Sequence, residues 1–176
     1  MTMTPRVTKL ALTAHVTSSV GWLGAVACFL GLSVVGLTSQ DAQTVRAVYL
    51  VMEPTAWFVL VPLSLASLLT GLVQSLGTKW GLFRHYWVLF KLLMNVFATI
   101  VLLMYMQTLD YFARLAAETT LSSGDLSGLR SPSPALHAGL ALLLLLVATV
   151  LAVYKPRGLT PYGRRKQYEQ RAVSQA

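Results

Sequence analysis

Residues 10–37 form an unbroken apolar stretch and read LALTAHVTSSVGWLGAVACFLGLSVVGL. The stretch contains no Asp, Glu, Lys or Arg, and as a helix rising ~1.5 Å per residue it would reach ~42 Å. That length crosses the ~30 Å hydrocarbon core of a bilayer with some tilt. The apolar core of a secretory signal has only ~7–15 residues, so we expect this segment to stay in the mature protein as a membrane span.

Three more apolar runs follow, at about residues 49–74, 86–106 and 135–154. The chain is 55% hydrophobic and 11% charged, whereas soluble domains have about 25% charged residues. A water-soluble chain of this size does not bury four such runs. The sequence therefore predicts an all-α, integral membrane four-helix bundle over residues 1–154. A basic tail, 155–176, would follow it and be poorly ordered.

The positive charges are concentrated at one end of the predicted bundle. That end carries Arg6, Lys9, Lys79, Arg84, Lys155, Arg157, Arg164, Arg165, Lys166 and Arg171, and the opposite end carries Arg46, Arg114 and Arg130. Lys and Arg beside a span resist translocation, so both termini are predicted to be cytoplasmic. The net charge of +8 would suggest nucleic acid in a soluble protein, but this placement favours a lipid bilayer as partner and no nucleic acid.

Small residues recur along the first two predicted spans. They are Ser18, Gly21, Gly24, Cys28 and Gly31 on the first span, and Ser64, Ser67 and Gly71 on the second. Small side chains let helix backbones approach closely, so we expect both sets to face inward. In the second span, Pro54 is expected in the first helical turn and Pro62 is expected to kink the middle.

Lys91 is the most unusual residue of the predicted spans. It lies about six residues inside the third span, roughly 9 Å below the interface. Trp87, Lys91, Asn95 and Thr99 follow at four-residue spacing, so they share one helical face. A lysine within a span usually faces the bundle interior, although its long side chain can also reach back to the headgroups. Asn95, one turn deeper, favours an interior polar stripe.

Three histidines remain to be placed. His15 lies at about the depth of Lys91, and its imidazole could ligate a haem iron or copper or simply donate a hydrogen bond. His85 starts the third helix at the same end, as an interfacial residue or a second ligand. His137 starts the fourth helix at the opposite end, about 20 Å away along the membrane normal. If two histidines hold one haem, the pair is therefore His15 and His85.

Two short motifs resemble known families. The spacing His15-x6-Trp22-x-Gly24 resembles the first helix of the CopD-type copper-resistance membrane domain and of the HemJ-type membrane protoporphyrinogen oxidase. Trp87-x3-Lys91 is similar to a later HemJ helix that carries a functionally important lysine. The resemblance implies an inner-membrane bundle that handles copper or haem b, with His15 as the ligand and Lys91 as its polar companion.

Over its whole length the chain resembles an uncharacterised family of small bacterial four-span integral membrane proteins. That resemblance implies a multi-pass protein of the bacterial cytoplasmic (plasma) membrane. We predict a polar site in its cytoplasmic half that binds a haem or metal in a redox or cofactor-handling role. The site residues are His15, Lys91 and Asn95, bordered by Trp22, Trp87 and His85.

Two alternatives stay open from the sequence. One is an accessory or scaffolding membrane subunit without a cofactor, acting with a membrane protein partner or as a homo-oligomer. The other is a small transporter that uses Pro62 and the polar stripe. The spans contain no paired carboxylates, and the chain has no Gly-rich phosphate loop after a strand, so hydrolytic and phosphoryl-transfer chemistry is not indicated.

Overall fold

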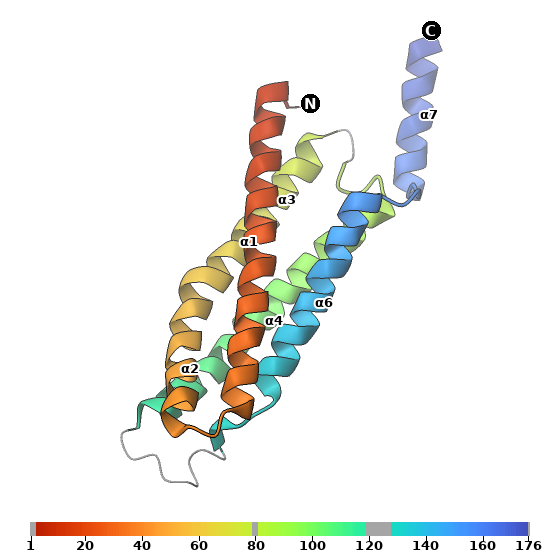
Figure 1. The fold of residues 1–176 in the computed structure, drawn as a ribbon. Coiled ribbons are helices and arrows are strands. Elements are labelled where there is room, and N and C mark those ends of the chain that lie inside the picture. Colours follow the sequence, from red (N-terminus) through yellow and green to blue (C-terminus); the bar gives the residue numbers. More distant parts are fainter. Residues whose placement is uncertain (1–2, 79–80, 119–127, 176) are drawn as a thin grey trace.

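Four long apolar helical segments run side by side in the computed structural model, which describes residues 3–78, 81–118 and 128–175 (Figure 1). Three of them are single helices: α1 (Pro5–Thr38), α4 (Tyr86–Ala117) and α6 (Ser133–Tyr154). The second span consists of α2 (Ala42–Thr55), a π-helical turn η1 (Ala56–Leu60) and α3 (Val61–Gly77). Each segment is long and apolar enough to cross a membrane, so the predicted all-α four-helix bundle is confirmed.

The bundle has a square arrangement in which α1 and α4 lie on a diagonal. Both helices pack against the second span and against α6. The N-terminus and the C-terminal helix lie at one end, together with the end of α3 and the start of α4 (Figure 1). We call this the terminal end. The opposite end, which holds the α1–α2 turn, the end of α4 and the start of α6, is called the loop end.

Asp41 sets the start of the second span. Its carboxylate accepts hydrogen bonds from the backbone N–H groups of Gln43 and Thr44 and from the Thr44 hydroxyl, the last at 2.6 Å. The Thr44 hydroxyl and these backbone N–H groups hold the pKa of Asp41 below its ordinary value. Because this cap starts the helix at Ala42, Pro54 lies inside α2, and the prediction that Pro54 occupies the first turn was wrong.

The irregularity predicted at Pro62 takes the form of a π-helical turn. Pro62 lies in the first turn of α3 and has no N–H to donate. Directly before it, the N–H of Val61 donates to the carbonyl of Ala56, five residues earlier. Such single π turns often mark functional positions of a helix. The second span is thus divided between two helices that join within the membrane.

The inner face of α1 differs from the prediction. Its buried residues include the large side chains of Trp22, Val26 and Phe29. Of the five small residues expected to face inward, Ser18 is buried and Gly21 packs near Leu63 of α3, whereas Gly24, Cys28 and Gly31 are exposed. The helix is apolar on all sides, so small side chains alone do not identify its packed face. The corresponding prediction for the second span is confirmed at Ser64 and Ser67, which are 0% and 2% exposed, and Gly71 packs against His15 of α1.

The tail is more ordered than expected, because α7 (Pro161–Gln175) follows α6. Thr160 starts this helix, and its hydroxyl accepts a hydrogen bond from the N–H of Gly163 at 3.0 Å. The Thr160 N–H and hydroxyl in turn donate to the carbonyls of Arg84 and Phe83, at 3.0 and 2.5 Å. These bonds attach the tail to the segment before α4.

The third span continues to Ala117, beyond the end of the apolar run near residue 106. Polar side chains close the loop end around it. The Arg46 Nε donates to the Ala116 carbonyl at 2.7 Å, which satisfies one of the last carbonyls of α4. The buried Tyr49 hydroxyl donates to the carbonyl of Leu129. Residues 119–127, between the third and fourth spans, lie outside the described residues.

Candidate functional site

A group of polar side chains connects three helices in the terminal half of the bundle. We call it the polar cluster. It contains His15, Ser18 and Ser19 of α1, Ser67 and Thr70 of α3, and Lys91 and Asn95 of α4. In the hydrocarbon interior no water replaces a missing hydrogen bond, so polar groups there need partners from the protein or from a ligand.

His15 is held in one orientation by α3. Its Nδ1 lies 3.1 Å from the hydroxyl oxygen of Thr70. The single hydroxyl proton of Thr70 is donated to the Ala66 carbonyl at 2.6 Å, so Thr70 accepts the bond from His15 Nδ1–H. A Cβ at Gly71 would lie 3.0 Å from the His15 ring, which shows how closely the ring approaches the α3 backbone. Nε2 is thereby left as the nitrogen with a free lone pair.

Ser67 is the centre of the network. Its hydroxyl lies 2.8 Å from the Ser19 hydroxyl and accepts a bond of 3.3 Å from Asn95 Nδ2. These two bonds join all three helices at a position where Ser67 is 2% exposed. The Oδ1 of Asn95 and the hydroxyl of Thr99, one turn deeper, are buried without a hydrogen-bond partner in the described structure. The cluster therefore has acceptor positions that its own residues do not satisfy.

Lys91 places a positive charge beside this network. Its Nζ lies 5.8 Å from the centre of the Trp87 ring, a cation–π distance, and it is close enough to His15 to interact electrostatically. No Asp or Glu in the described part of the chain forms an ion pair with Lys91. A cation within a span is costly unless it is paired. The cluster thus combines a cation, a free imidazole nitrogen and an unsatisfied amide oxygen.

The remaining predicted site residues lie at its margin or elsewhere. Trp87 borders the cluster through Lys91. His85 precedes α4, pairs through its backbone with Leu159, and lines a basic hollow of about 590 Å³ with residues of the tail. Trp22 is buried but lines a different pocket. The His85 ring also lies 6.3 Å from the ring of Trp87, at the margin of the cluster.

Sequence reasoning missed the part played by α3. Ser67 was identified only as a small residue for helix packing, and Thr70 was not identified at all. The available signal was their three-residue spacing, which places both hydroxyls on one face of a helix. Their hydrogen bonds to α1 and α4 depend on which helices are neighbours, and spacing within one span does not give that.

The residues fit some of the predicted ligands better than others. In the described residues no three His, Cys, Asp or Glu side chains come together to hold a metal ion, and the charge of Lys91 beside His15 disfavours a bare copper ion there. The pairing of His15 with His85 as two ligands of one haem stays a prediction: His15 contacts Thr70 of α3, and the His85 ring lies 6.3 Å from the ring of Trp87, which borders the cluster. One iron ligand at His15 does fit, since its Nδ1–H is engaged in the way that orients ligating histidines. His15, Lys91 and Asn95 are each half-buried, so a ligand can approach from the side of the bundle.

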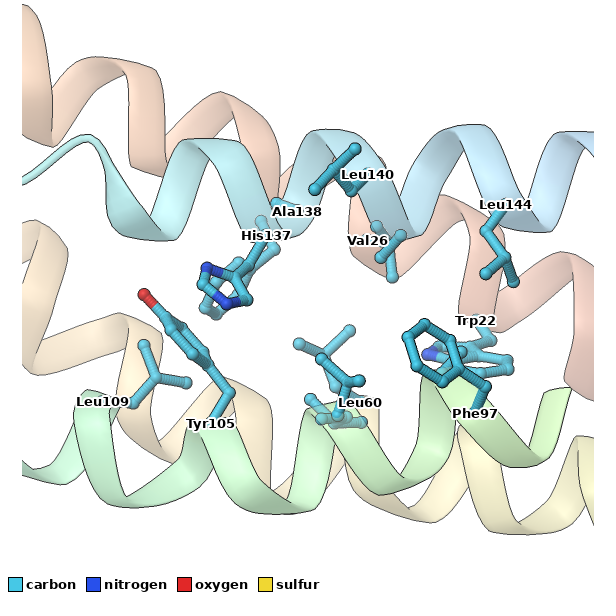
Figure 2. Close-up of a pocket in the computed structure, with 15 residues that line it drawn as sticks. Trp22, Val26, Leu60, Phe97, Tyr105, Leu109, His137, Ala138, Leu140 and Leu144 are labelled. Atoms are coloured by element: carbon cyan, nitrogen blue, oxygen red, sulfur yellow. The ribbon is translucent and has the colours of Figure 1, made fainter. Parts of the chain in front are cut away.

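A second, apolar pocket of about 310 Å³ lies between α1, α4 and α6 (Figure 2). Leu60 of η1 forms part of its wall. Tyr105 and His137 lie at one end of it, and Trp22 and Phe97 lie at the other (Figure 2). It is separate from the polar cluster, because none of the cluster residues lines it.

Comparison with protein-family models, with curated proteins and with solved structures finds no match for this chain.

Proposed function

We propose that this integral membrane protein binds an anionic, membrane-soluble cofactor at the polar cluster and takes part in handling that cofactor. The observation that carries the proposal is Lys91, a cation in a membrane span with no ion-paired Asp or Glu in the described residues. A carboxylate of the cofactor would supply the missing negative charge. A donor on the same molecule would satisfy the Oδ1 of Asn95.

Haem b is the cofactor class that we favour. It combines a large apolar ring with two carboxylates, and the HemJ-like motifs at His15 and Lys91 point to a tetrapyrrole. His15 would hold the iron through Nε2, and Lys91 would hold a carboxylate. Bound there, the iron would supply one-electron redox chemistry. The contribution of the chain is to fix the His15 ring through Thr70 and Gly71 and to provide the counter-charge.

Titration of the detergent-purified protein with haemin, followed by difference absorption spectroscopy, tests this function. We expect His15→Leu to abolish the spectral signature of imidazole ligation. Lys91→Met should keep that signature and weaken binding about tenfold, the loss of one charge-assisted hydrogen bond. His137→Leu serves as the matched control, because it removes a histidine from the loop end. The proposal fails if the wild type does not bind haemin or if all four proteins bind it equally.

The transporter alternative keeps one specific observation in its favour. The π-helical turn lies between Pro54 and Pro62 in the middle of the second span. Interrupted helices are typical of transporters, where the free backbone groups contact the substrate. Solute or proton flux into proteoliposomes that is lost in Lys91→Ala would support this alternative. If the protein shows neither ligand binding nor flux, the accessory or scaffolding role remains.

A further inference from the structure

The apolar pocket extends from the loop end towards the middle of the bundle. Tyr105 and Phe97 are eight residues apart on α4, so at ~1.5 Å per residue the pocket extends about 12 Å along the helix. Phe97 and Leu140 line it and are largely exposed at the side of the bundle. In a membrane protein that side faces hydrocarbon, so the pocket is accessible to molecules dissolved in the lipid.

The loop end of the pocket has a built polar group. The Tyr105 and His137 rings stack with centroids 4.1 Å apart (Figure 2). The Tyr105 hydroxyl lies 3.0 Å from the Ser133 hydroxyl. His137 Nδ1 lies 2.9 Å from the Ser133 carbonyl, which can only accept, so Nδ1 carries the proton. The other ring nitrogen, Nε2, is therefore left to contact a ligand. In the neutral ring it accepts a hydrogen bond.

The rest of the lining is apolar and rich in rings. Trp22, Phe29 and Phe97 join Leu and Val side chains, and Ala98, Ala138 and Ala141 leave the space open because their side chains are small. Aromatic walls favour a flat, aromatic guest through ring stacking. A single polar end and a long apolar body also match the orientation of an amphipathic molecule in one leaflet, with its head group near the interface.

From these features we infer that the pocket binds a lipid-soluble aromatic molecule with a hydroxyl group, of the chemical class of quinols and alkylphenols. The hydroxyl donates to His137 Nε2 beside Tyr105, and the apolar body extends towards Trp22. A neutral imidazole accepts a hydrogen bond from a hydroxyl group. A plain hydrocarbon chain has no such donor. This site is independent of the polar cluster and of any cofactor bound there.

Trp22 provides a direct reporter for occupancy, because its ring lines the pocket. We would replace the other tryptophans with phenylalanine (W57F, W80F and W87F) and titrate the single-tryptophan protein in nanodiscs. The probe is a bromophenol with an octyl chain, since bromine quenches indole fluorescence only at contact range. Octylbromobenzene, which lacks the hydroxyl, is the matched ligand. We expect saturable quenching by the phenol with about fivefold higher affinity than the matched ligand, the effect of one hydrogen bond.

Three variants locate the effect. H137F should lower the affinity for the phenol to that for octylbromobenzene and leave the latter unchanged, whereas H15F, in the polar cluster, should change neither. A138L, which fills the pocket, should remove saturable quenching by both ligands. If H137F does not fold, comparing the affinities of the two ligands for the protein with His137 intact still shows whether the pocket recognises the hydroxyl group. Equal affinities there, or equal quenching by a brominated phospholipid that the phenol does not displace, would overturn the inference.

Discussion

Replacing Asn95 with leucine should stabilise the bundle, although it removes a hydrogen bond. The bond from Asn95 Nδ2 to the Ser67 hydroxyl is 3.3 Å long, and a side-chain hydrogen bond within a membrane contributes about 0.6 kcal/mol on average. The Oδ1 of the same side chain is buried without a partner in the described structure, which costs about 1–3 kcal/mol. Leucine removes both the hydrogen bond and the unpaired oxygen, and it fills a similar volume. The net gain in the free energy of unfolding is then about 0.5–2 kcal/mol.

The contrasting substitution is Ser67→Ala. It removes the hydroxyl that both Ser19 and Asn95 contact, at a site that is 2% exposed, and it leaves their polar atoms buried. We expect it to lower the free energy of unfolding by about 1–2 kcal/mol. In the double variant the cost of Ser67→Ala should shrink, because Asn95 no longer needs that partner.

Unfolding of the purified protein in mixed micelles, followed by circular dichroism over increasing denaturing detergent, measures these differences. The opposite signs of the two single variants are the essential result. A loss of more than about 1 kcal/mol in Asn95→Leu would refute the reasoning, because it would mean that Oδ1 has a partner in the membrane.

Three predictions concern the loop end. Tyr49→Phe leaves the Leu129 carbonyl without its donor and should lower the free energy of unfolding by about 1–3 kcal/mol; no change in denaturation would contradict this. Arg46→Gln should speed amide hydrogen exchange in the last turn of α4, whose carbonyls Arg46 contacts, and unchanged exchange would show that this contact is not formed. The lowered pKa of Asp41 means that its cap stabilises the fold above its ordinary pKa and loses this effect as the pH falls through the lowered value. Asp41→Asn also caps but does not titrate, so it should lose less stability than wild type below about pH 4 in thermal unfolding scans; an equal loss would contradict this.

The fold was predictable because each span carries its own signal. Apolar length identifies a membrane helix without reference to the rest of the chain, and all four runs lie in helical segments long and apolar enough to cross a membrane. The boundaries were less predictable, because they depend on caps. The second span begins at Ala42 because Asp41 caps it, although the apolar run begins only near Tyr49. The helix of the tail likewise depends on the contacts of Thr160 with the segment before α4, which composition does not reveal.

The candidate site was predictable only in part. Depth along the helix correctly grouped His15 with Lys91, because rise per residue fixes the level of a side chain in the bilayer. Depth does not give the direction in which a side chain points around the bundle. His85 was grouped with His15 by depth alone; its backbone pairs with Leu159 and its ring lies 6.3 Å from the Trp87 ring, so a role beside His15 stays a prediction. The connecting hydroxyls of α3 were missed because depth does not give this direction.

The central claim is that Lys91 supplies the counter-charge for a carboxylate of a membrane-soluble cofactor. The most direct test compares metal-free protoporphyrin IX with its dimethyl ester, which lacks free carboxylates, by fluorescence titration of wild type and Lys91→Met. Because both porphyrins contain no iron, ligation of iron by His15 does not contribute to their binding. We predict that the free acid binds wild type about tenfold more tightly than the ester, and that Lys91→Met removes this difference. Equal binding of acid and ester by the wild-type protein would contradict the claim.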